Sequence, residues 1–263
     1  MHYLTEDTVE QAALEWLGEL GYGVRFGGDI APGEPAAERA SYDEVLLLGR
    51  LRDALGRINP DVPPAALDEA LRKVQRAESQ NPVLNNHTFH RLLTEGVDVS
   101  YRAGGQVRHG KVWLVDFAHP ANNDWLAVNQ FTITGQNLRS MARTNRRPDI
   151  VLFVNGLPLA VIELKNPADE SATIRRAFNQ LLTYQNDIPA LFTYNAALVV
   201  SDGPDARLGT LTSGWEWFKP WRTIEGDTLA PPGQLQLEVL IKGVFEPGRF
   251  LDLVRHFTVF EAN

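Results

Sequence analysis

The 263-residue chain contains no cysteine, so it can form neither a disulfide nor a zinc site built on thiolates. Its apolar runs are all far shorter than the ~18 residues that a membrane-spanning helix needs. The first ten residues lack the basic and then apolar pattern of a secretory signal. The sequence also has no internal repeat and no low-complexity tract. These absences predict a cytoplasmic protein that has no membrane partner.

The charge balance is acidic, with 33 Asp and Glu against 25 Lys and Arg and a net charge of −8. This balance argues against a general nucleic-acid coat, although local patches matter more than the sum. One basic patch, made of Arg139, Arg143, Arg146 and Arg147, directly precedes Asp149. It could be the solvated end of a helix. We favour a patch that faces phosphate groups, because it leads straight into an acidic centre.

Periodicity and turn signals predict an α/β core with insertions. The length suits one large domain, or one domain with an elaborated insertion. Residues 25–40 are rich in glycine and proline and are predicted to form a loop. The patterns predict helices at 5–20, 41–56, 64–79, 171–186, 234–242 and 247–256, and strands at 99–102, 107–117, 125–134, 150–154, 159–162 and 197–200.

The most informative segment is the apolar hairpin RPDIVLFVNGLPLAVIELKN at 147–166. Asp149 opens its first strand, and Glu163 and Lys165 close the second. Side chains two apart on a strand point the same way, about 6–7 Å from each other, so Glu163 and Lys165 share a face. Two converging carboxylates can hold a divalent cation, and a lysine beside them can position a water. The segment therefore predicts a metal-dependent phosphodiesterase.

The register of this hairpin sets a geometric condition on the site. Asn155-Gly156 predicts a two-residue turn, and strict pairing from that turn sets Asp149 opposite Ile162. Because neighbouring residues point to opposite faces, Asp149 and Glu163 would then lie on opposite sides of the sheet. Pro158 also cannot donate a ladder hydrogen bond. We therefore predict an odd-numbered loop, a β-bulge or a strand bend that shifts the register by one residue.

Three further polar residues are candidates for the same site. Gln180 and Tyr184 are four apart on a predicted helix and therefore share one of its faces. The alternative is that they form the ordinary edge of an amphipathic helix. Glu10 lies at the edge of the apolar stripe of the first helix, where it could reach the acidic pair or remain a solvated helix acid.

Pro148-Asp149 followed by Glu163-x-Lys165 resembles the signature of the PD-(D/E)xK nuclease superfamily. More narrowly, it is similar to the amino-terminal nuclease domain of the restriction (R) subunits of type I restriction-modification enzymes. The likeness is weakest over 25–98. It is carried by residues 5–24, 129–137, 146–167, 181–203 and 245–261.

The resemblance implies a PD-(D/E)xK restriction-endonuclease-like fold, in which helices flank a central mixed sheet. Residues 1–245 would form the nuclease domain, with a helical and loop insertion over about 25–98. Residues 246–263 would lead towards an ATP-dependent translocase. The sequence has no G-x-x-x-x-G-K-[ST] loop. ATP would therefore bind only in that motor, and the chain is expected to be an expressed fragment or a truncated product.

The resemblance also implies roles for individual residues. Mg²⁺ would be bound by Asp149, Glu163 and the backbone carbonyl of Leu164, with Glu10 placed near the metal by the first helix. Lys165 would orient the attacking water. The glutamine and tyrosine of the later helix would support the site, and the four arginines would grip the DNA backbone without reading its sequence.

The function expected from these residues is that of a type I site-specific deoxyribonuclease, a Mg²⁺-dependent endonuclease domain that cuts double-stranded DNA. Its partners would be the modification and specificity subunits of a type I complex. A free-standing repair or resolvase-type nuclease is one alternative. A non-catalytic docking module, whose acids are structural, is another.

Overall fold

The computed structural model describes residues 5–77, 79, 81–103, 105–166 and 173–260. Four predicted features fall partly outside these residues: Gly104 of a predicted turn, residue 78 of one predicted helix, residues 171–172 of another, and residues 261–263 of the predicted connector. Within the described part, no helix is long and apolar enough to cross a membrane.

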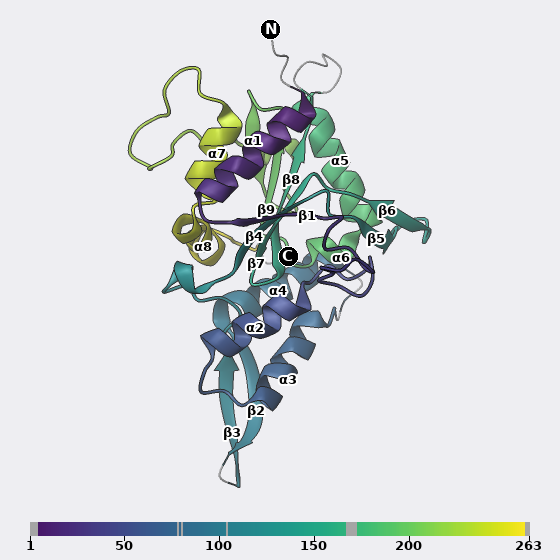
Figure 1. The fold of residues 1–263 in the computed structure, drawn as a ribbon, viewed down its shortest axis with the longest axis vertical. Helices are drawn as coiled ribbons and strands as arrows, with labels where there is room; N and C mark the ends of the chain where they lie inside the picture. Colours follow the sequence, from purple (N-terminus) through teal and green to yellow (C-terminus); the bar gives the residue numbers. More distant parts are fainter. Residues whose placement is uncertain (1–4, 78, 80, 104, 167–172, 261–263) are drawn as a thin grey trace.

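A mixed sheet of six strands forms the centre of the molecule (Figure 1), in the order β1-β4-β7-β8-β9-β10. β1 runs parallel to β4 and β8 runs parallel to β9, whereas the remaining pairs are antiparallel. This confirms the predicted α/β fold with a central mixed sheet. The strands are β1 (Gly23–Phe26), β4 (Trp125–Asn129), β7 (Ile150–Val154), β8 (Leu157–Leu164), β9 (Ala197–Ser201) and β10 (Ala206–Gly209).

β7 and β8 lie in the middle of this sheet and are buried along their whole lengths. A strand whose side chains are apolar on both faces must be covered on both faces. The prediction that this hairpin is central is therefore confirmed. β1 was not predicted. The predicted loop starts at residue 25, whereas residues 25 and 26 belong to this strand, so the predicted start of the loop is wrong.

Helices flank the sheet, and the first of them is specified locally. The hydroxyl of Thr5 accepts a hydrogen bond from the Thr8 amide, which caps the first turn of α1 (Glu6–Glu19). α1 packs against α7 (Gln236–Val244) and the sheet, and α7 is followed by α8 (Pro247–His256). α5 (Ile174–Asp187) and the short α6 (Pro189–Phe192) make the crossover from β8 to the parallel strand β9.

An arm projects from the lower end of the molecule (Figure 1). In it, α3 packs on the hairpin formed by β2 and β3, and α2 packs on α3.

The helix predicted from residue 41 begins only at 48, and the strand predicted over 107–117 ends at 112. The elements of this region are α2 (Leu48–Ile58), α3 (Pro64–Gln75), α4 (Pro82–Glu95), β2 (Val97–Ala103) and β3 (Gln106–Val112). Two 3-10 turns, η1 (Pro120–Asn122) and η2 (Trp215–Trp217), lie elsewhere.

A second two-stranded hairpin, β5 (Ile133–Gln136) and β6 (Arg143–Arg146), stands beside the central sheet. The strand predicted over 125–134 is divided, because Gln130 adopts a left-handed backbone conformation with φ 55°. The arginine patch lies on this hairpin and its loop. It is therefore not the end of a helix.

The β7–β8 hairpin has the register shift that the sequence predicts. Asn155 and Gly156 both have positive φ and form a two-residue turn, with Val154 opposite Leu157. Phe153 pairs with Pro158 but Leu152 pairs with Ala160, so Leu159 is an extra, bulged residue. Beyond the bulge, Ile150 lies opposite Ile162. Continued by one residue, this register sets Asp149 opposite Glu163.

We predict that Gly156→Ala destabilises the protein by about 2–4 kcal/mol. Gly156 has φ 78°, and a Cβ there would lie 2.4 Å from the carbonyl oxygen of Leu47 at the start of α2. Gly233 has φ 94° with nothing within 4 Å of such a Cβ, so Gly233→Ala should cost only about 1 kcal/mol of backbone strain. Urea unfolding of both variants checks this, and equal losses would contradict it.

Candidate active site

The predicted acidic pair lies buried at the end of the central hairpin. Asp149 is 7% exposed and Glu163 is fully buried. One carboxylate oxygen of Asp149, Oδ2, accepts a hydrogen bond of 2.7 Å from the backbone amide of Leu164. This bond ties the start of β7 to the end of β8 and fixes the aspartate beside the glutamate.

Lys165 completes the centre. Its Nζ donates to Oε1 of Glu163 at 2.9 Å and to the carbonyl oxygen of Leu164 at 2.6 Å. The prediction that Glu163 and Lys165 share a face is therefore confirmed. The other glutamate oxygen, Oε2, is buried and accepts no hydrogen bond from any described residue. A buried carboxylate oxygen without a donor is costly, and it is the acceptor that a cation would satisfy.

Burial and the charges of neighbouring acids shift both acids towards their neutral forms. Burial raises the pKa of Asp149 to about 6, against the opposing effects of the Leu164 amide and the Lys165 ammonium. Burial, and then the charge of Asp149, raises the pKa of Glu163 well above its usual range. Two acids held together at such a cost indicate a functional site, in which added positive charge would stabilise both carboxylates.

α1 brings two further carboxylates towards this pair. Glu10 is buried and accepts hydrogen bonds from the side chains of Asn129 at 2.7 Å and Gln130 at 2.6 Å. Its charge contributes to the raised pKa of Asp149. The charge of the half-buried Glu6, one helical turn earlier, raises the pKa of both Asp149 and Glu163. This face of α1 therefore borders the site rather than bulk solvent.

Glu10 lies beside the acidic pair rather than within it. In the part of the chain that the structure describes, no three His, Asp or Glu side chains are grouped closely enough to hold a metal ion together. Both carboxylate oxygens of Glu10 also already have amide donors. Its role as a metal ligand stays a prediction, whereas Asp149 and Glu163 form the inner pair.

The helix residues predicted to support the site are joined to each other. The side-chain amide of Gln180 donates to the hydroxyl of Tyr184 at 2.6 Å. Burial, and then the charge of Glu163, raises the pKa of Tyr184. The tyrosine is thus close enough to sense the acidic pair. An ordinary solvated helix edge would not show this.

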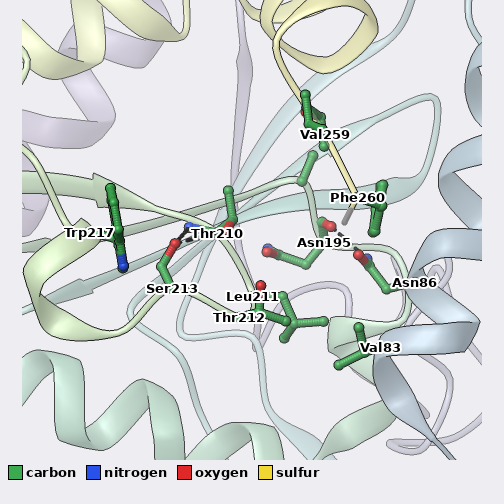
Figure 2. Close-up of a pocket in the computed structure, with 12 residues that line it drawn as sticks. Val83, Asn86, Asn195, Thr210, Leu211, Thr212, Ser213, Trp217, Val259 and Phe260 are labelled. Carbon is green, nitrogen blue, oxygen red and sulfur yellow. Dashed lines mark hydrogen bonds between the residues drawn. The ribbon is translucent and has the colours of Figure 1, made fainter. Parts of the chain in front are cut away.

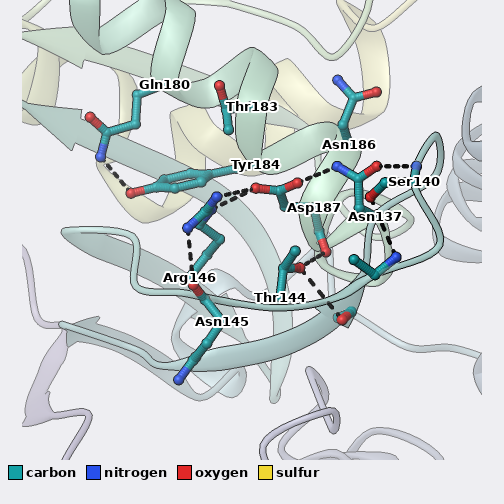
Figure 3. Close-up of polar contacts among 12 residues, drawn as sticks. Asn137, Ser140, Thr144, Asn145, Arg146, Gln180, Thr183, Tyr184, Asn186 and Asp187 are labelled. Carbon is teal, nitrogen blue, oxygen red and sulfur yellow. Dashed lines mark hydrogen bonds and ion pairs between the residues drawn. The ribbon is translucent and has the colours of Figure 1, made fainter.

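The four arginines divide into two kinds. Arg146 binds Asp187, with Nε 2.6 Å and Nη2 2.5 Å from Oδ2 (Figure 3). Arg139, Arg143 and Arg147 are exposed, and none of them forms an ion pair with a described residue. Their predicted contact with DNA stays a prediction. Arg146 instead has a partner inside the protein.

A cavity of about 700 Å³ lies elsewhere, between α4, the loop around residues 210–213 and the segment 258–260 (Figure 2). Asn86, Asn195, Trp217 and Phe260 are among the residues that line it, and none of its lining residues is ionisable. It offers no ionisable acid or base, so the acidic pair is the stronger candidate for an active site.

Sequence reasoning missed four residues around the site: Glu6, Asn129, Gln130 and Asp187. The spacing of Glu6 and Glu10, four apart on one helix, was a usable signal. The contacts of Asn129 and Gln130 with α1 join residues about 120 positions apart in the chain, and no local pattern announces them. The same holds for Asp187, whose arginine partner is 41 residues away.

The fold and the buried acids with their lysine are consistent with a nuclease of the PD-(D/E)xK type. Residues 3–217 match the family described as "Type I restriction enzyme R protein N terminus". The chain belongs to this family.

Two relatives match over 99% of the chain. The HindI type I restriction enzyme endonuclease subunit of Haemophilus influenzae is 39% identical over 262 residues. A putative type I endonuclease subunit of Methanocaldococcus jannaschii, MjaIXP, is 30% identical over 279 residues. The chain spans only 24% and 26% of the lengths of these two relatives.

We predict that Asp149→Asn stabilises the protein in EDTA at neutral pH. The pKa of Asp149 is raised from 3.8 to about 6, so between these values the folded state holds more protons than the unfolded state. The stability of the wild type should therefore fall as pH rises from 4 to 6, by up to about 3 kcal/mol. The variant lacks this loss. Its advantage should be largest above pH 6.5 and vanish near pH 4.

Urea unfolding from pH 4 to 8 measures this difference. Asp227→Asn, a substitution at an exposed acid, is the control and should run parallel to the wild type. A pH-independent difference between Asp149→Asn and the wild type would refute the assignment of a buried, destabilised carboxylate.

Proposed function

We propose that this chain is a Mg²⁺-dependent endonuclease domain that hydrolyses phosphodiester bonds of double-stranded DNA. The observation that carries the proposal is the buried pair of Asp149 and Glu163, with Lys165 alongside and one glutamate oxygen that has no donor among the described residues. The relatives are named as endonuclease subunits of type I restriction enzymes, which supports this activity for the present chain.

The donor set suits a hard divalent cation. Carboxylate and carbonyl oxygens are the ligands that Mg²⁺ prefers, and this centre offers the two carboxylates and the carbonyl of Leu164. Burial raises the pKa of both acids, so nearby positive charge would favour their ionised forms. Bound Mg²⁺ would supply that charge, polarise the scissile phosphate and lower the pKa of a coordinated water.

The protein's own groups would orient the reactants. The ammonium of Lys165 donates hydrogen bonds to Glu163 and to the Leu164 carbonyl. These two bonds fix the direction of its third N–H. It can position the attacking water and donate to the phosphate oxygen that gains charge. Glu10 would act through water from the face of α1. Gln180 and Tyr184 would close the side formed by α5.

In a longer protein, this domain would cut DNA that other parts deliver. We propose that it works in a type I complex with modification and specificity subunits. We also propose that ATP-driven translocation belongs to a segment outside these 263 residues. The domain itself would contact the DNA backbone, with sequence recognition left to another subunit. Arg143 and Arg147, which are exposed, would meet its phosphate groups.

Asp149→Ala and Lys165→Ala should each reduce DNA cleavage at least about 100-fold. The first removes a carboxylate that would hold the metal, and the second removes an ammonium that would stabilise charge in the transition state. The measurement is nicking and linearisation of plasmid DNA by the full-length subunit in its complex. ATP hydrolysis should be unchanged in both variants. Lys219→Ala, at an exposed lysine, is the matched control, and normal cleavage by either site variant would remove that residue from catalysis.

Mn²⁺ and Mg²⁺ should raise the Tm of the wild type, because a ligand that binds only the folded state stabilises it. Asp149→Asn and Glu163→Gln should abolish the increase, whereas Asp227→Asn should retain it. Differential scanning calorimetry and isothermal titration of each protein check this. If well-folded wild type binds neither ion, the domain is a docking module whose acids are structural.

A further inference from the structure

The hairpin formed by β5 and β6 is the most basic element beside the site. Residues 133–147 contain four arginines and no acid, within a chain of net charge −8. Arg139 and Arg143 are exposed and form no ion pair with any described residue. Asp43, an exposed acid, lies close enough for the charge of Arg143 to contribute to its lowered pKa. The hairpin therefore presents positive charge to solvent.

This hairpin is fastened to the last turn of α5 (Figure 3). Asp187 is buried and receives Arg146 on one carboxylate oxygen and the side-chain amide of Asn137 on the other. The hydroxyl of Thr144 donates to the backbone carbonyl of Asp187 at 2.6 Å, and the amide of Leu138 donates to that of Asn186 at 2.9 Å. An isolated two-stranded hairpin is marginally stable, so these bonds define its position.

The loop of the hairpin is ordered but turns apolar side chains outwards. The side chain of Asn137 accepts the amides of Arg139 and Ser140, and its carbonyl accepts the amide of Met141. Met141 has φ 58° and is 61% exposed, and Leu138 is 43% exposed. A left-handed methionine in an ordered loop is strained, and no packing within the described residues explains its exposure.

The anchor also links the hairpin to the acidic centre. Tyr184 and Asp187 are three apart on α5 and share a face. Arg146 is near both of them. It donates a hydrogen bond to Asp187, and its positive charge lowers the pKa of Tyr184, partly offsetting the effect of burial. The hairpin is thus held at a fixed position relative to the tyrosine that senses Glu163.

We propose that the β5–β6 hairpin is a rigid DNA-gripping element. Arg139 and Arg143 bind phosphates of duplex DNA, Leu138 and Met141 enter the groove between them, and the Asp187 anchor sets the distance from the grip to the scissile bond. Apolar side chains flanked by arginines suit a DNA groove. This inference rests on the proposed function, since it assumes that the acidic pair acts on DNA.

The test measures duplex binding without cleavage. Fluorescence anisotropy of a labelled 30-base-pair duplex in EDTA gives Kd at several salt concentrations. Arg139→Ala with Arg143→Ala should weaken binding at least about 10-fold and lower the slope of log K against log salt by about 1.8, for two lost phosphate contacts. Arg102→Ala with Arg108→Ala, which removes two exposed arginines from the arm hairpin, is the matched control and should change neither.

Asp187→Asn distinguishes the effect of anchoring the hairpin from the effect of net charge on DNA binding. This substitution removes a negative charge, so electrostatics alone would tighten DNA binding, whereas a loosened hairpin should bind several-fold more weakly. Circular dichroism checks its folding. Leu138→Ser with Met141→Ser, which leaves the anchor intact, should weaken binding without changing the salt slope.

Wild-type affinity in the Arg139 and Arg143 double variant, or an equal loss in the control, would overturn the proposal. So would the absence of duplex binding by the wild type. Tighter binding by Asp187→Asn would overturn the anchor. If the hairpin binds DNA as expected but Mg²⁺ supports no cleavage, the proposed catalytic function fails and the DNA-gripping element stands.

Discussion

A single extra residue in β8 decides whether this protein has an acidic pair at all. The turn at Asn155 and Gly156 closes the hairpin with two residues, and a regular ladder from there would send Asp149 and Glu163 to opposite faces. The bulge at Leu159 adds one residue on one strand and returns both acids to the same side.

The surrounding structure stabilises that bulge on both of its sides. Pro158 has no N–H to donate, so the ladder is already interrupted next to the extra residue. The carbonyl of Leu159 accepts the amide of Ala196 at 2.7 Å, at the start of the neighbouring strand. On the other side, the buried side chain of Asn155 bonds Asp124, Leu114 and Asn123. The register is therefore fixed by contacts with three separate segments.

Much of the site followed from the sequence, since its signals are local. The alternation of strand side chains joined Glu163 with Lys165, and the conflict between a two-residue turn and a shared face required the register shift. The features that the sequence did not predict depend on contacts between residues far apart in the chain. No pattern near Arg146 shows that its partner is Asp187, and Gln130 gives no local sign of the left-handed backbone that divides the predicted strand and brings its side chain to Glu10.

One face of α5 unites the parts of this molecule that bear on chemistry. Gln180, Tyr184 and Asp187 follow one another at spacings of four and three, so they lie along a single stripe of the helix. The first two hold each other beside Glu163, and the third holds the β5–β6 hairpin through Arg146. Phe178 and Leu181 of the same helix are buried in the hydrophobic core. The β5–β6 hairpin and the side chains beside Glu163 are therefore attached to one stripe of a single helix, which sets the spacing between them.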